Sequence, residues 1–224
     1  MFKKTILLLS MFLVISSCKQ NDNKNQQNSD VSSKQTVVTS PKNINEEDLT
    51  LLKNIASGAY KTDFNKPEAG KVYNTPDQIK ILEVKNNFVI LEYTASGCLE
   101  YDPSPAKALW YYNDNKWNDM NIAKILGYED CPTMIKIQLI DIDNDGYLDV
   151  ILNGGVGDDS NVAIFLNKNM SFSKVEIPVE KGDNRSINKI GTCGETVVSV
   201  YHYTESGDVK EKLLKFNCVT SSFE

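Results

Sequence analysis

Four aspartates close together in the sequence are the side chains best placed to bind a metal ion. They stand at positions 1, 3, 5 and 9 of a nine-residue segment: Asp141, Asp143, Asp145 and Asp149. Calcium takes six to eight oxygen ligands, and side chains at alternate positions of a tight loop can converge on one point. Position 7, Tyr147, would add its backbone carbonyl, and Gly146 would allow a sharp turn at positive φ. The spacing therefore predicts a Ca²⁺ site, with a solvated acidic turn as the alternative.

The segments on either side of this loop have the patterns of β-strands. Ile135, Ile137 and Leu139 alternate with polar residues, which is typical of a half-buried strand. The apolar run 150–152 after the loop predicts a short buried strand. An EF-hand would need a glutamate at position 12 of the loop, where this chain has Leu152. We therefore expect the loop to join two strands rather than two helices.

The pattern Asp-x-Asp-x-Asp-Gly-x-x-Asp between apolar strands resembles the FG-GAP/VCBS repeat, the calcium-loop unit of integrin-type β-propellers. The resemblance covers about residues 135–177 and includes Asn153-Gly154-Gly155, a strand at 162–167 and a strand at 171–175. The turn at Lys168-Asn169 lacks the glycines usual in such units, and the acidic loop has no second copy. The resemblance implies calcium binding and a propeller-like fold, although the chain is too short for seven blades.

A helix followed by hairpins is expected in the rest of the folded part. Asn45 is a good N-cap before an acidic first turn, and Gly58 is expected to end the helix. Four hairpins are expected, with turns at 86–87, 113–116, 168–169 and 206–208. These elements predict a mainly β fold in which antiparallel hairpins form a small propeller-like domain of four or five blades, or a sandwich, with one N-terminal helix.

The N-terminal segment 1–18 has the features of a bacterial lipoprotein signal peptide. Lys3 and Lys4 precede an apolar stretch, 6–15, which is too short to span a bilayer. Ile15-Ser16-Ser17-Cys18 resembles a lipobox, in which the chain is cleaved before Cys18 and that cysteine is acylated. Plain secretion is the alternative.

The next segment, 19–45, is expected to tether a folded domain to the lipid. It is almost entirely polar and cannot bury enough apolar surface to offset the entropy of ordering. Residues 46–224 are long enough for one β-rich, calcium-binding domain. This layout predicts a lipid-anchored envelope protein at the outer membrane, facing the periplasm or the cell surface. Loss of Lys3 and Lys4 with the leader moves the net charge from −6 to about −8, which argues against a nucleic-acid partner.

Four further cysteines predict disulfides, because an even number in an exported chain is typical of paired thiols. They are Cys98, Cys131, Cys193 and Cys218. Cys193 and Cys218 flank the last hairpin near cross-strand register, which favours this pair and leaves Cys98 with Cys131. Other pairings and buried thiols are alternatives. The chain has no Cys-x-x-Cys, so thiol redox chemistry is not expected.

Motifs for catalysis are few, so a binding protein is expected rather than an enzyme. The one histidine, His202, lies in a strand-like run, and the chain lacks the Gly-x-Ser-x-Gly, P-loop and His-Glu-x-x-His patterns. An envelope glycan hydrolase using a carboxylate pair is the less favoured alternative. Two loops, 97–103 and 154–161, are candidate contact loops.

The layout as a whole is similar to that of small periplasmic lipoproteins that inhibit peptidoglycan hydrolases. This resemblance implies a protein partner, a lysozyme-like hydrolase, and an acidic monomer would suit such a basic target. The alternative is a glycan-binding or adhesion lipoprotein that uses an aromatic platform: Trp110, Tyr111, Tyr112 and Trp117. Core packing of at least two of these aromatic residues is the competing expectation.

Overall fold

The computed structural model describes seven segments of the 224-residue chain. These are residues 42–63, 71–96, 103–129, 132–155, 160–180, 182–204 and 206–224, all in one compact unit. Several predicted features lie outside the described residues: the signal peptide with Cys18, most of the tether, and the pair Cys98 and Cys131. The same holds for most of the candidate contact loop 97–103 and for half of the loop 154–161.

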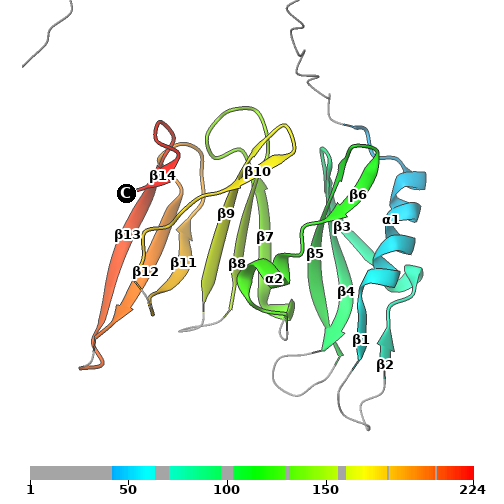
Figure 1. Cartoon of the computed structure of the whole chain (residues 1–224), viewed down its shortest axis with the longest axis horizontal. Helices are drawn as coiled ribbons and strands as arrows, with labels where there is room; N and C mark the ends of the chain where they lie inside the picture. Colours follow the sequence, from blue (N-terminus) through cyan, green and yellow to red (C-terminus); the bar gives the residue numbers. More distant parts are fainter. Residues whose placement is uncertain are drawn as a thin grey trace, which may run out of the picture. The chain divides into compact units, whose positions relative to one another are not determined.

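The described residues form three four-stranded antiparallel sheets and one two-stranded sheet (Figure 1). The first four-stranded sheet contains β3 (Lys80–Lys85), β4 (Phe88–Ser96), β5 (Pro103–Asn113) and β6 (Lys116–Asp119). The second contains β7 (Ile135–Ile140), β8 (Asp149–Gly154), β9 (Asn161–Lys168) and β10 (Ser171–Lys174). The third contains β11 (Asn184–Lys189), β12 (Val197–Tyr203), β13 (Val209–Asn217) and β14 (Ser222–Phe223). The two-stranded sheet pairs β1 (Lys61–Asp63) with β2 (Lys71–Tyr73).

Each four-stranded sheet is a meander, because its strands pair in chain order. The expected mainly β class is therefore confirmed. The propeller-like or sandwich arrangement of these sheets stays a prediction.

The four predicted hairpins are present, and in two of them the turn consists of two residues at positive φ. Asp114 and Asn115 have φ of 51° and 60°, and Asn169 and Met170 have φ of 52° and 64°. Two consecutive residues at positive φ give a two-residue turn whose twist matches that of the strands. The backbone N–H of Met170 donates to Oδ1 of Asn167 at 2.7 Å, which stabilises this turn.

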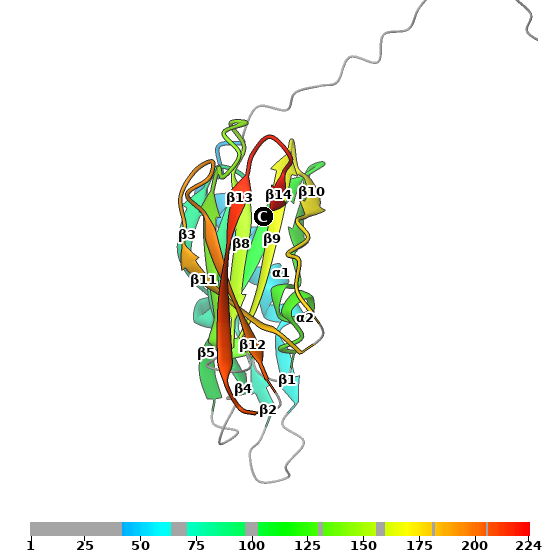
Figure 2. The ribbon, with the colours of Figure 1, turned by 90° about the vertical axis from the view of Figure 1, so that its left-hand side faces the viewer.

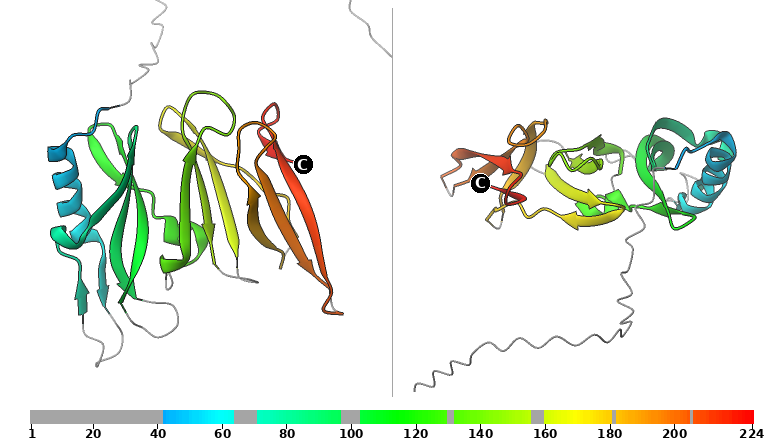
Figure 3. Two further views of the ribbon diagram at one scale, coloured as in Figure 1. Left: turned by 180° about the vertical axis from the view of Figure 1, so that it is seen from behind. Right: turned by 90° about the horizontal axis from the view of Figure 1, so that it is seen from above.

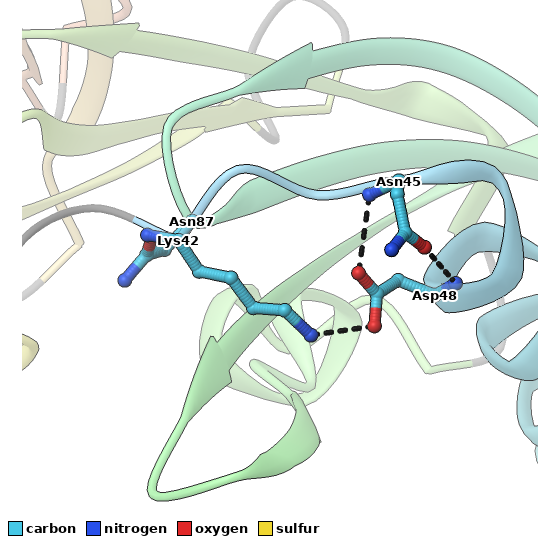
Figure 4. Close-up of polar contacts among 4 residues, drawn as sticks. All are labelled: Lys42, Asn45, Asp48 and Asn87. Carbon is cyan, nitrogen blue, oxygen red and sulfur yellow. Dashed lines mark hydrogen bonds and ion pairs between the residues drawn. The ribbon is translucent and has the colours of Figure 1, made fainter.

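Helix α1 (Glu46–Ala59) begins at the predicted cap. The Asn45 side chain accepts a hydrogen bond from the backbone N–H of Asp48, and the Asp48 carboxylate accepts one from the backbone N–H of Asn45 (Figure 4). Lys42 pairs with the same carboxylate, and its backbone N–H donates to the Asn87 side chain at the β3–β4 turn. These contacts fix the start of α1 next to the first four-stranded sheet.

A second helix, α2 (Ile122–Leu126), was not predicted from the sequence. It is five residues long, which is too short for helical periodicity to stand out. Gly127 ends it at φ 78°, in the left-handed region that favours glycine. Ile122 and Leu126 are buried on the side of the first sheet that faces the second.

Three apolar clusters hold the sheets and α1 together. Leu52 and Ala56 of α1 pack on one face of the β3–β6 sheet, which α1 covers in Figure 3. The opposite face of that sheet, with Phe88 and Leu109, packs against Leu152 and other residues of the β7–β10 sheet. The far face of the β7–β10 sheet shares a third cluster with the β11–β14 sheet, which lies in front of it in Figure 2. Within the described segments, neither helix is long and apolar enough to cross a bilayer.

The Leu52→Ala variant tests the packing of α1 on the first sheet. Leu52 is fully buried, so truncation should lower the free energy of unfolding by about 2–5 kcal/mol through lost burial and a cavity. The adjacent Leu51 is 53% exposed, and Leu51→Ala should change it by about 0.5 kcal/mol or less. Urea unfolding measures both, and equal effects would contradict this packing.

Candidate metal centre

The acidic loop joins two paired strands, as its flanking patterns predict. β7 and β8 pair antiparallel, and the last pair, Ile140 with Asp149, stands at the base of the loop. β8 is buried along most of its length, whereas β7 alternates between buried and more exposed residues. The strand pair therefore holds the two ends of the loop beside each other.

Asp149 is the fully buried carboxylate at the base of this loop. Its Oδ2 accepts a hydrogen bond from the backbone N–H of Ile142 at 2.8 Å. Its Oδ1 accepts one from the backbone N–H of Asn167, in β9, also at 2.8 Å. One side chain thus ties the loop to the neighbouring strand, and both of its oxygens have a backbone donor. Each oxygen keeps a second lone pair, which leaves it able to bind a cation.

Three of the four predicted aspartates converge. Carboxylate oxygens of Asp141, Asp143 and Asp149 lie within 4.8 Å of one another. Burial raises the pKa of Asp149 to about 6; hydrogen bonds from Asn167 and Ile142 oppose this rise, and the nearby charges of Asp143 and Asp145 add to it. Burial and the charge of Asp145 also raise the pKa of Asp143. A cation among these oxygens would offset the cost of keeping them ionised.

The tip of the loop is closed by the carboxylate of Asp141. Its Oδ1 accepts from the backbone N–H of Asp145 at 3.1 Å, and its Oδ2 accepts from that of Gly146 at 2.9 Å. Gly146 has φ of 91°, as the predicted sharp turn requires. The Asp145 carboxylate accepts from the backbone N–H of Tyr147 at 2.9 Å and is outside the converging group. Ligand roles for Asp145 and the Tyr147 carbonyl stay predictions.

Ile142 connects the loop to the third four-stranded sheet. It is fully buried, and its carbonyl accepts a hydrogen bond from the backbone N–H of Cys193 at 2.8 Å. Cys193 is bonded to Cys218, with 5.3 Å between their Cα atoms, which confirms that predicted pair. The loop is therefore held by Asp149 on one side of the Ile142 backbone and by the disulfide-linked segment on the other.

Asn167 and Ile142 are two site residues that the spacing of the aspartates did not reveal. The side chain of Asn167 is nearly buried and donates to the carbonyl of Leu148 at 3.0 Å, at the end of the loop. The signal for Asn167 was present in the strand ending Leu166-Asn167, which belongs to the repeat-like pattern. The signal for Ile142 was its apolar side chain between Asp141 and Asp143, which indicates a buried position within the loop.

The donors present fit a hard cation. All three converging groups are carboxylates, and oxygen-only sites suit calcium, magnesium or manganese rather than softer metals. Three carboxylates can supply part of the shell of such an ion. The choice of calcium among these ions rests on the loop's spacing and resemblance.

The predicted aromatic platform is largely core. Trp110 and Trp117 are 4% and 8% exposed, and both pack beneath α1. Trp110 donates from Nε1 to the Tyr60 hydroxyl at 2.8 Å. Tyr111 packs edge-on against Phe172 in the cluster between the first and second sheets. The competing expectation of core packing is thus confirmed for both tryptophans.

Comparison of the chain with protein-family models, with curated proteins and with solved structures found no significant match.

The Asp149→Ala variant tests the tie between the loop and β9. Without added cation it should lower the free energy of unfolding by about 2–6 kcal/mol, because two buried N–H groups each lose an acceptor at about 1–3 kcal/mol. Asp145→Ala removes an exposed carboxylate of the same loop and should cost about 1 kcal/mol or less. Urea unfolding in chelator measures both variants. A parent-like Asp149→Ala protein would show that the loop is held by other contacts.

The raised pKa of Asp149 predicts an unusual pH dependence in the cation-free protein. Folded Asp149 keeps its proton up to about pH 6, whereas the unfolded chain releases it near pH 4. Between these values the folded state binds more protons, so the stability contributed by this group falls as pH rises.

Urea unfolding at a series of pH values, in chelator, measures this fall. The slope between about pH 4 and 6 should be smaller in Asp149→Asn, and calcium should flatten it in the parent because the ion replaces the proton. The same slope in parent and variant would contradict the assignment.

Proposed function

We propose that this chain is a calcium-stabilised binding protein of the bacterial envelope, anchored by lipid on Cys18, that recognises a macromolecular partner. The observation that carries the proposal is the convergence of Asp141, Asp143 and Asp149 on a loop whose base is buried. A bound ion would cancel the repulsion among these carboxylates and stabilise the folded state by mass action. The ion's role in this proposal is structural rather than catalytic.

The proposed partner is a protein, with a lysozyme-like hydrolase as the leading candidate. The chain has 30 acidic and 24 basic side chains, which suits a basic target through electrostatic steering. The loop tip at Asn144, Asp145 and Gly146 is exposed and would be available for contact. Burial of Trp110 and Trp117 weighs against the alternative, a glycan held on an aromatic platform.

The finer architecture is also a proposal. We infer that the three four-stranded meanders are blade-like units of a small propeller-like domain, with the calcium loop between the first two strands of the second unit. Successive units share apolar clusters, which supports this interpretation. The sandwich alternative would pair two of these sheets as the principal layers.

Calcium binding is tested with the double variant Asp143→Ala and Asp145→Ala. The parent should bind one ion by isothermal titration calorimetry, and the variant should lose binding. A hundredfold excess of calcium over Kd should stabilise the parent by about 2.7 kcal/mol and leave the variant unchanged. Glu83→Ala with Glu176→Ala, two exposed carboxylates outside the loop, is the matched control and should bind like the parent. A double variant that still binds and gains stability would place the calcium site elsewhere.

Partner recognition is tested by capture from envelope and secreted extracts, using the chain with calcium and again with chelator. Retention of a lysozyme-like hydrolase whose activity then falls would support the protein-partner proposal. Retention of polysaccharide instead would favour the glycan alternative. The double variant serves as a control for chelation. It should fail to retain a calcium-dependent partner even with calcium present, as the parent fails to retain it in chelator.

A further inference from the structure

A pocket on the third four-stranded sheet lies apart from the acidic loop. Its volume is about 530 Å³, and it lies between the inner face of β12 and β13 and residues Pro178, Val179, Glu180 and Asp183, which precede β11. Val179 and Val200 give it an apolar lining. The chain's one histidine, His202, is at its side, with the side chain 46% exposed.

His202 is held in one orientation by a nearly buried carboxylate. Nδ1 of its ring lies 2.7 Å from Oδ1 of Asp183, whose side chain is 6% exposed. The other oxygen of Asp183 accepts the backbone N–H of Glu180 at 2.9 Å. The hydrogen bond from His202, reinforced by that of Glu180, holds the pKa of Asp183 below its ordinary value. Nδ1 is thereby occupied, and Nε2 is the ring nitrogen available to a ligand.

Two lysines stand on the same face of the sheet as His202. Lys210 is directly opposite His202 in the β12–β13 pairing, and Lys212 is directly opposite Val200. Because side chains alternate along a strand, both lysines lie on the pocket side, and both line the pocket. Glu211 also lines the pocket, although strand alternation directs its side chain, opposite Tyr201, to the other face of the sheet. Three nitrogen-bearing side chains therefore lie on the same side of the pocket as the apolar Val200.

Among the described residues, three carboxylates line the pocket, and the two on the side of the lysines, Asp183 and Glu180, reduce the positive charge of the lysines to different degrees. Asp183 is engaged by His202 and by the Glu180 backbone, so it is shielded from a ligand. Glu180 is exposed and lines the pocket, and of the two carboxylates on the pocket side it is the one that a bound anion would meet. Its charge should weaken anion binding without blocking it.

We propose that this pocket binds a small organic anion, a phosphate or carboxylate group carried on an apolar body, through His202 Nε2, Lys210 and Lys212. The contact between Nδ1 and Asp183 orients the ring, and Nε2 is the nitrogen that would meet the anion. The lysine ammonium groups add charge-assisted hydrogen bonds. Val179 and Val200 contact the apolar body of the ligand, for which the pocket is large enough.

Nuclear magnetic resonance of the single histidine tests this site directly. The full chain is titrated with phenyl phosphate, and separately with benzoate and inorganic phosphate, at fixed pH and ionic strength without added calcium. Phenyl phosphate should shift the His202 ring signals saturably and bind at least threefold more tightly than inorganic phosphate. Equal affinities for phenyl phosphate and inorganic phosphate would contradict the proposal that the pocket binds the apolar body of the ligand. A chemical shift change that stays linear with concentration for all three probes would show that the site does not exist.

Matched variants separate a site from general electrostatics. Lys210→Ala with Lys212→Ala should weaken phenyl phosphate binding at least tenfold, whereas Glu180→Gln should strengthen it. Lys189→Ala with Lys215→Ala removes two exposed lysines from the same sheet outside the pocket lining and should change affinity by less than twofold. An equal loss in the two lysine pairs would contradict the proposal. Thermal unfolding checks that each variant is folded.

Discussion

A single buried carboxylate holds the acidic loop in its place. Asp149 begins β8, and its two oxygens accept backbone N–H groups from the loop and from β9. Burying an ionised carboxylate is costly unless it is paired or hydrogen-bonded, and two backbone donors do not fully offset the cost here, because the pKa is raised to about 6. A positive charge next to Asp149, either a proton or a cation, therefore stabilises the folded loop.

The same loop also links two of the sheets. The N–H of Ile142 bonds to Asp149, and its carbonyl accepts a hydrogen bond from Cys193, next to the disulfide in the third sheet. Side chains of Ile142, Ile151 and Val198 belong to one apolar cluster. A change in the loop therefore acts on the contact between the second and third sheets as well as on the ion. Because of this linkage, an ion bound at the loop would also stabilise the packing between the second and third sheets.

Local sequence signals are sufficient for α1 and for the four hairpins, but not for the short helix α2. Asn45 and the acidic first turn identified α1, and asparagine or glycine turns identified the hairpins, because capping and turn formation involve residues close in sequence. The Cys193–Cys218 pair was predictable for the same reason, since both residues flank one hairpin. The class of the fold follows directly from those hairpins.

Contacts between distant segments were beyond the sequence. Asp149 and Asn167 are 18 residues apart, and their hydrogen bond depends on how β8 pairs with β9. Asp183 and His202 are 19 residues apart, and the sequence pattern gave His202 no partner. The tryptophans could be placed in the core or on a surface until the packing of α1 was known. In each case the missing information was a register or a packed face rather than a residue type.

Anomalous diffraction from crystals of the protein grown with calcium is the most direct test of the central claim. The account predicts one strong peak at the loop, with carboxylate oxygens of Asp141, Asp143 and Asp149 at about 2.3–2.6 Å. It also predicts that Asp149 keeps its hydrogen bonds to Ile142 and Asn167 in the same crystals. A calcium ion bound elsewhere, or no peak at the loop at saturating calcium, would contradict it.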